Sequence, residues 1–149
     1  MRTWGAGLLL LALISLGAVA AETPSSAYLA YRKALAGAKD IEAVFPYLSR
    51  GAAVRLRQDL ERMPPGQRGL ALQLIQEMMP RDVTILRTKL RDANATLLVR
   101  GAVDNPLTPD KRLTMSYGTV TMVREDGRWR FVVEKWESVK PRATPTPGR

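Results

Sequence analysis

Cysteine and histidine are both absent from this chain of 149 residues. Without cysteine there can be no disulfide, no thiol nucleophile, no thiolate metal ligand and no lipid attachment at a cysteine. Without histidine the chain lacks the commonest general base and metal ligand of proteins. These absences exclude Ser-His and Cys-His catalysis and zinc sites, so we expect no metal and no cofactor. Any catalysis would depend on carboxylates.

Long apolar runs are scarce too, and the one at the N-terminus is short. Arg2 precedes an apolar run from Leu8 to Leu16, and Ala18-Val19-Ala20 supplies small residues after it. This order is typical of a secretory signal peptide, here residues 1–21, with cleavage after Ala20 or Ala21. The run is shorter than the roughly 20 residues that span a bilayer. We therefore expect an exported protein, periplasmic or secreted, without a membrane anchor after cleavage.

Positive charge dominates the chain, with 23 Lys and Arg against 14 Asp and Glu and a net charge of +9. Such a balance is compatible with a surface that binds anionic polymers, or with a generic basic surface. The arginines of the third predicted helix do not favour one binding stripe, because positions 50, 55, 57 and 62 spread around a helix at 100° per residue. No nucleic-acid-binding motif is present, so we expect no nucleic-acid partner.

Helical signals fill the first half of the mature sequence. Thr23-Pro24 is a cap followed by a proline at the first helical position, and Tyr28, Tyr31 and Leu35 then recur on one helical stripe. Asp40 and Ser49 cap two further segments. The predicted helices cover residues 25–38, 41–48, 49–63 and 67–79.

Strand signals fill the second half, where the apolar period becomes alternating after Asp82. Asp126-Gly127 favours a tight turn between two apolar arms, which predicts a β-hairpin over residues 118–136 at the centre of the sheet. The predicted strands cover residues 82–90, 95–103, 113–124 and 129–137, with a polar loop over residues 105–111. The tail, residues 140–149, is rich in proline and is expected to be disordered.

Strict alternation predicts which side chains share a face of each strand. In the last strand it places Trp129, Phe131 and Val133 on one face, and Arg130, Val132, Glu134 and Trp136 on the other. In the first strand it separates Val83 and Ile85 from Thr84, Leu86, Thr88 and Leu90. Both faces of the last strand carry large apolar groups, so we expect helices on one side and partial cover on the other.

Helices followed by a four-stranded antiparallel meander make an α+β plan. Three features of the chain carry a resemblance to a known family: the stripe of Tyr28, Tyr31 and Leu35, the corner Phe45-Pro46-Tyr47-Leu48, and the closing segment VTMVREDGRWRFVVEKW. With them, residues 25–138 resemble the nuclear transport factor 2-like superfamily. This superfamily includes SnoaL-like and ketosteroid isomerase-like proteins. The resemblance implies a strongly bent, cone-like sheet wrapped around a long helix, in a single domain over residues 22–139. It implies no particular chemistry.

Eight residues are candidates for lining the mouth of such a cone. Aromatic and thioether groups form adaptable apolar pockets, an arginine can hold an anionic group, and a carboxylate can act as a base. The candidates are Tyr28, Tyr31, Tyr47, Arg100, Met115, Tyr117, Glu134 and Trp136. The alternative is that the aromatic residues belong to the core, and that Glu134 faces solvent beside Arg130 or Lys135.

Three functions remain open on the sequence. The leading hypothesis is an exported, non-catalytic domain that binds a small apolar or anionic ligand or an envelope partner, and that forms a homodimer through its sheet. One alternative is an isomerase- or cyclase-like enzyme with a buried carboxylate and a tyrosine. The other is a binder of anionic envelope polymers through surface arginines.

Overall fold

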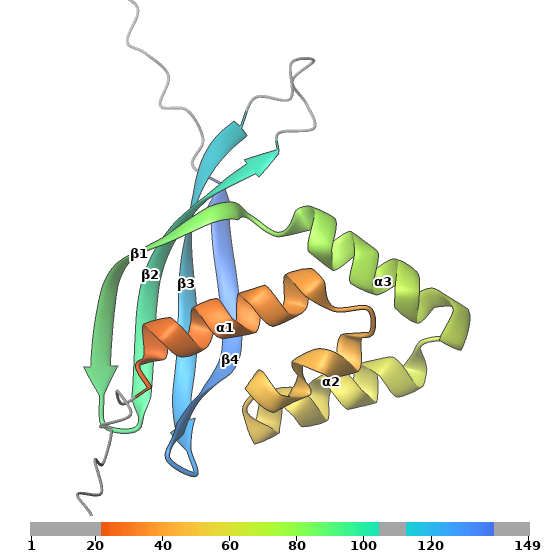
Figure 1. The fold of residues 1–149 in the computed structure, drawn as a ribbon, viewed down its shortest axis with the longest axis horizontal. Helices are drawn as coiled ribbons and strands as arrows, with labels where there is room; N and C mark the ends of the chain where they lie inside the picture. The colour runs from red at the N-terminus through yellow and green to blue at the C-terminus, as the bar shows by residue number, and fades with distance from the viewer. Residues whose placement is uncertain (1–21, 105–112, 139–149) are drawn as a thin grey trace, which may run out of the picture.

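A computed structural model describes residues 22–104 and 113–138 (Figure 1). In these residues, helices precede a four-stranded antiparallel sheet, which confirms the predicted α+β class. The elements are α1 (Pro24–Gly37), the 3-10 helix η1 (Ile41–Tyr47), α2 (Arg50–Arg62), α3 (Pro65–Met78), β1 (Arg81–Arg91), β2 (Asn94–Asp104), β3 (Leu113–Glu125) and β4 (Arg128–Ser138). The predicted signal peptide, the loop 105–111 and the tail 140–149 lie outside the described residues.

The helices begin where their capping residues predict. The Thr23 hydroxyl accepts from the backbone N–H of Ser26, whose own hydroxyl accepts from the Thr23 N–H, so two free donors of α1 are satisfied. The side chains of Asp40 and Ser49 cap η1 and α2 by accepting from the backbone N–H groups of Glu42 and Ala52. α3 begins at Pro65, two residues before its predicted start, because proline is tolerated in the first turn of a helix.

The strands form one open sheet in the order β1-β2-β3-β4. Asp126 and Gly127 join β3 to β4 with φ values of 51° and 78°, the left-handed geometry expected of an Asp-Gly hairpin turn. This hairpin does not form the central pairing that the sequence predicts. The middle of the sheet is the β2-β3 pair, and β4 is an edge strand.

A β-bulge at Val132 corrects the predicted faces of β4. Phe131 lies opposite Met122 and Val133 lies opposite Thr121, so Val132 is an extra residue without a partner in the register. One extra residue reverses the alternation beyond it. Trp129, Phe131, Glu134 and Trp136 therefore share one face, and the prediction that Trp129 and Trp136 lie on opposite faces is wrong. The backbone N–H of Ser49 donates to the Phe131 carbonyl at 2.8 Å, which bonds the start of α2 to this irregular edge.

Two irregularities in β1 change its predicted faces as well. They lie between Arg81 and Thr84, and between Ile85 and Arg87. Past them, Thr88 faces the helices, where its hydroxyl lies 3.1 Å from that of Ser25 in α1. Thr88 and Leu90 consequently lie on the same face as Ile85, not opposite it as strict alternation predicts.

The two faces of the sheet differ in their cover. On the inner face, buried side chains of β2, β3 and β4 meet α1 and η1 and form the core. Figure 1 shows α1 lying across this face, with α2 and α3 extending beyond β4. The main core residues are Tyr28, Tyr31, Leu35, Ile41, Val44, Leu97, Val99, Val120, Met122 and Phe131. Among the described residues no helix packs on the opposite, outer face, where partial cover was expected.

Helix α3 is attached more loosely than α1. Leu72 is its buried residue, whereas Leu70, Leu74 and Met78 form an exposed ridge at a spacing of four. The side-chain amide of Gln76 donates to the carbonyls of Leu35 and Ala38, both at 2.9 Å. Because the last carbonyls of a helix lack partners within it, Gln76 completes the C-terminal end of α1. This contact places the end of α3 above the inner face.

Candidate functional site

The eight predicted pocket residues do not form one site. Tyr28, Tyr31, Glu134 and Trp136 lie on or against the inner face, and Tyr47 packs half-buried beside the core at the end of η1. Arg100, Met115 and Tyr117 lie on the outer face and are exposed. The prediction that these three share a pocket with Tyr28 is wrong, because odd and even positions of β2 and β3 point to opposite sides of the sheet.

Stacked aromatic rings fill the middle of the inner face. The centroids of Tyr31 and Phe131 lie 4.1 Å apart, and the Tyr28 ring lies 6.5 Å from each of them. Tyr28 is completely buried and Tyr31 is 8% exposed. These rings are core, which is the alternative that the sequence left open for them.

Glu134 reaches into this interior, not into solvent. The Tyr28 hydroxyl donates to a Glu134 carboxylate oxygen at 2.7 Å, and the Arg32 guanidinium donates to the Tyr28 oxygen at 3.1 Å. Arg32 lies 3.8 Å from the same carboxylate and also donates to the Pro80 carbonyl. Glu134 therefore pairs with Tyr28 and Arg32, not with Arg130 or Lys135. We call these three residues the buried polar cluster.

The electrostatics of the buried polar cluster keep its phenol neutral. Burial, and then the adjacent Glu134 carboxylate, raise the pKa of Tyr28 well above its ordinary value, and the same two causes raise the pKa of Tyr31. Tyr28 thus remains a hydrogen-bond donor at neutral pH. The half-buried carboxylate is held by one neutral donor and one cation, as expected of a charge that is partly removed from water.

Beside the cluster, the inner face opens into a hollow of about 450 Å³. It lies between the end of α3 and the ends of β2, β3 and β4. Its walls are mostly apolar, and a pair of opposite charges, Arg81 and Asp104, lies 3.0 Å apart on its rim. The lining residues are Glu77, Met78, Met79, Pro80, Arg81, Val103, Asp104, Ser116 and Trp136. We call this space the end hollow.

Trp136 connects the end hollow to the buried polar cluster. Its ring packs over Gly118, where an added Cβ would lie 2.8 Å from a ring carbon, so only glycine leaves room for the indole. The guanidinium carbon of Arg32 lies 6.0 Å from the centre of the ring on the cluster side. The indole Nε1 is buried and has no hydrogen-bond partner among the described residues. An unpaired buried donor is costly, and this one is closed off from the end hollow as well as from solvent.

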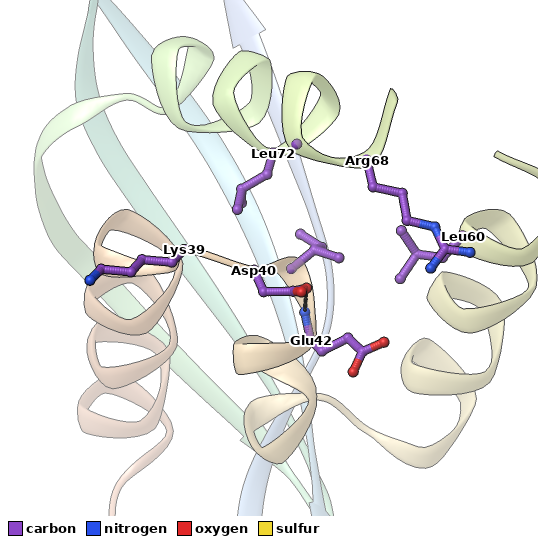
Figure 2. A pocket seen from close by; sticks show the side chains of 8 residues that line it. Lys39, Asp40, Glu42, Leu60, Arg68 and Leu72 are labelled. Carbon is purple, nitrogen blue, oxygen red and sulfur yellow. Dashed lines mark hydrogen bonds between the residues drawn. The ribbon is translucent and has the colours of Figure 1, made fainter. Parts of the chain in front are cut away.

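A second, smaller pocket lies between the end of α1, η1, α2 and α3. Figure 2 shows that Lys39, Asp40, Glu42 and Arg68 surround it together with Leu60 and Leu72. Its volume is about 80 Å³, and the Asp40 carboxylate is already occupied by capping the Glu42 N–H at 2.9 Å. The Lys39 side chain points away from the other charged groups in Figure 2, and the pocket is too small for an organic ligand.

No protein-family model matches the chain, and no curated protein matches it either. Its chemistry must therefore be inferred from the site itself. Within residues 22–104 and 113–138, no cluster of three acidic, histidine or cysteine side chains could hold a metal ion. The helices in the same residues include none that is long and apolar enough to cross a membrane.

Sequence reasoning missed Arg32 and most of the end hollow. Arg32 lies four residues after Tyr28, so the two share a helix face, and a cation inside that apolar stripe was the available signal. No pattern in the sequence indicates the end hollow. Met78 and Met79 end a helix, Val103 ends β2 and Ser116 lies in β3, and only the assembled fold brings them together.

Proposed function

We propose that this chain is an exported ligand-binding domain that takes a small, largely apolar molecule into the end hollow. The single observation that carries the proposal is a largely apolar hollow of about 450 Å³ that Trp136 lines. That volume lies within the range of about 300–1,000 Å³ typical of ligand sites, which combine apolar walls with a few polar groups.

The proposal includes membership of the nuclear transport factor 2-like superfamily and its cone-like sheet. Support comes from the order of the elements, in which α1 crosses the inner face and four antiparallel strands follow as a meander. The bulges of β1 and β4 support a bent sheet, because an extra residue increases local bending and twist. In this interpretation the end hollow is the open end of the cone. Export is inferred from residues 1–21 of the sequence.

Binding in the end hollow is tested with a neutral apolar dye, Nile red, whose fluorescence rises in apolar surroundings. We expect one saturable site and quenching of tryptophan fluorescence as the dye approaches Trp136. Met78 is 70% exposed and lines the hollow, so Met78→Glu adds a charge to its wall without disturbing the core. This substitution should weaken dye binding at least about tenfold, the effect of about 1.4 kcal/mol.

Leu70→Glu is the matched control for that experiment. Leu70 is 66% exposed on the same ridge of α3 but does not line the hollow, so the same charge placed there should leave the affinity unchanged. Equal weakening in the two variants would place the dye on the ridge of α3 and overturn the proposed site. Native mass spectrometry of protein purified from its own host would then identify the natural ligand by its mass.

The 2.7 Å contact between Tyr28 and Glu134 favours a second candidate function, an isomerase- or cyclase-like enzyme. In this candidate the Glu134 carboxylate removes a proton from a carbon atom of the substrate, and Tyr28 positions that carboxylate by donating a hydrogen bond to it. A panel of enolisable ketones assayed by deuterium exchange in heavy water would detect that step. We expect exchange to fall at least a hundredfold in Glu134→Gln, in line with the usual contribution of a general base. Exchange that persists in Glu134→Gln would exclude this role.

A further inference from the structure

The outer face of the sheet has an ordered distribution of charge. The register of the strands determines which side chains lie on this face. One cross-strand row consists of Arg87, Leu98, Thr119 and Lys135. Arg100, Tyr117 and Glu137 belong to the next row, and Lys89, Thr96, Thr121 and Val133 to the row on the other side. Cations are thus most frequent on the edge strand β1, with Arg100 in β2 and Lys135 in β4, and uncharged side chains occupy most of the two middle strands.

Besides Arg81, which pairs with Asp104, and Arg128 at the β3-β4 turn, five exposed cations share this face, and Glu137 is the acid that lies among them. The cations are Arg87, Lys89, Arg91, Arg100 and Lys135. None of the five forms an ion pair with another described residue. The other acids of the outer face lie at strand ends and have partners, since Asp104 pairs with Arg81 and Glu125 accepts from the Arg50 N–H. Away from the strand ends, the outer face therefore carries a net positive charge.

Apolar groups accompany these cations. Leu98, Met115, Tyr117 and Val133 are each 40–43% exposed on the outer face, although the inner face of the same strands is buried. Together they make a broad surface of apolar side chains and one tyrosine beside the cationic edge at β1. Exposed apolar groups gathered in this way are typical of an interaction site, in contrast to single exposed residues.

We propose that the outer face binds the surface of a bilayer rich in anionic phospholipids. The cations meet the headgroup phosphates, and Leu98, Tyr117 and Val133 enter the boundary between headgroups and acyl chains, as Tyr and aliphatic groups do at membrane interfaces. The binding is peripheral and separate from the end hollow, which opens on the inner side of the sheet.

Charge and composition favour a lipid surface over other partners. A second copy stacked face to face would bring two net positive faces together, and like charges repel. A single-stranded nucleic acid is bound by several stacking aromatics, whereas the outer face carries Tyr117 alone among the described residues. A lipid surface can interact with both kinds of group, because its phosphates bind the cations and its acyl chains contact the apolar side chains.

Co-sedimentation with vesicles tests the proposal. The chain is used from Glu22 to its end, because all core residues lie between Ala27 and Phe131 and the apolar run of residues 8–16 would itself insert. We expect binding to vesicles of phosphatidylglycerol and phosphatidylcholine, none to phosphatidylcholine alone, and loss as salt is raised. Since each cation near an anionic membrane contributes about 1 kcal/mol, the double variant Arg87→Gln with Lys135→Gln should bind roughly 25-fold more weakly.

Lys33→Gln with Arg55→Gln is the matched control, removing one Lys and one Arg from exposed positions of α1 and α2. These charges lie on the helical side of the sheet, and screening over a Debye length of about 10 Å makes their removal nearly neutral for vesicle binding. Arg87→Lys with Lys135→Arg should bind as the parent does. Circular dichroism checks that all variants are folded.

Leu98→Ser with Val133→Ser separates a lipid surface from an anionic polymer. This variant should bind vesicles more weakly yet bind heparin or a single-stranded oligonucleotide as the parent does. Three results would each overturn the proposal. The first is an equal loss of vesicle binding in Arg87→Gln with Lys135→Gln and in Lys33→Gln with Arg55→Gln. The others are stronger binding to the oligonucleotide than to the vesicles, and a stable homodimer that excludes vesicles.

Discussion

Phe131→Ala is expected to lower the free energy of unfolding by about 3–5 kcal/mol, the usual cost of removing a buried phenylalanine. The Phe131 ring lies against Tyr31 at 4.1 Å and is 8% exposed, so its removal leaves a cavity between two tyrosines that the fold cannot easily close. Urea denaturation followed by circular dichroism measures the change. A value below about 1 kcal/mol would contradict the assignment of Phe131 to the core.

Val133→Ala provides the control, and it tests the bulge at Val132 directly. Without the bulge Val133 would share the buried face of Phe131, and its truncation would be costly. With the bulge it lies on the outer face, 40% exposed, so its truncation should change stability by no more than about 0.5 kcal/mol. A loss comparable to that of Phe131→Ala would show that the strand keeps strict alternation.

Arg32→Met is expected to destabilise the protein by about 3 kcal/mol. The substitution keeps the length of the side chain but leaves Glu134 with Tyr28 as its one partner and leaves the Pro80 carbonyl without its donor. Breaking a buried ion pair by removing one partner costs about 3–5 kcal/mol. The lower end applies here, because the Glu134 side chain is 21% exposed while that of Arg32 is 10% exposed.

Arg50→Met is the matched control for Arg32→Met. Arg50 lies 2.6 Å from Asp126, a shorter contact than the 3.8 Å between Arg32 and Glu134, but both side chains of that pair are more than 70% exposed. Exposed pairs contribute little because water screens them, so Arg50→Met should leave the denaturation midpoint unchanged. Replacing both members of the inner pair, Arg32→Met with Glu134→Leu, should recover part of the loss, since no unpaired charge is then buried. Similar losses from Arg32→Met and Arg50→Met would refute a structural role for the buried polar cluster.

Local chemistry was sufficient to predict the order of the elements and most of their bounds. Thr23, Asp40 and Ser49 cap the helices that follow them, and Asp126-Gly127 turns the last hairpin, because each acts on backbone groups within a few residues. The candidate site was predicted less well. The structure brings Tyr28 and Glu134 into contact and places Trp136 on the same face of the sheet, whereas Arg100, Met115 and Tyr117 belong to the opposite face.

What the sequence determined by itself was therefore local: the α+β order, the caps, the turns, and the exclusion of cysteine and histidine chemistry. The tertiary structure decided which side chains meet. The bulge at Val132 moves Glu134 to the inner face, and the junction of η1 and α2 is bonded to that edge by Ser49 and Phe131, more than 80 residues apart. Tyr28 and Glu134 then form a hydrogen bond across 106 residues of sequence. A single unpaired residue reverses every face beyond it, and no periodicity within the strand can show where that residue will lie.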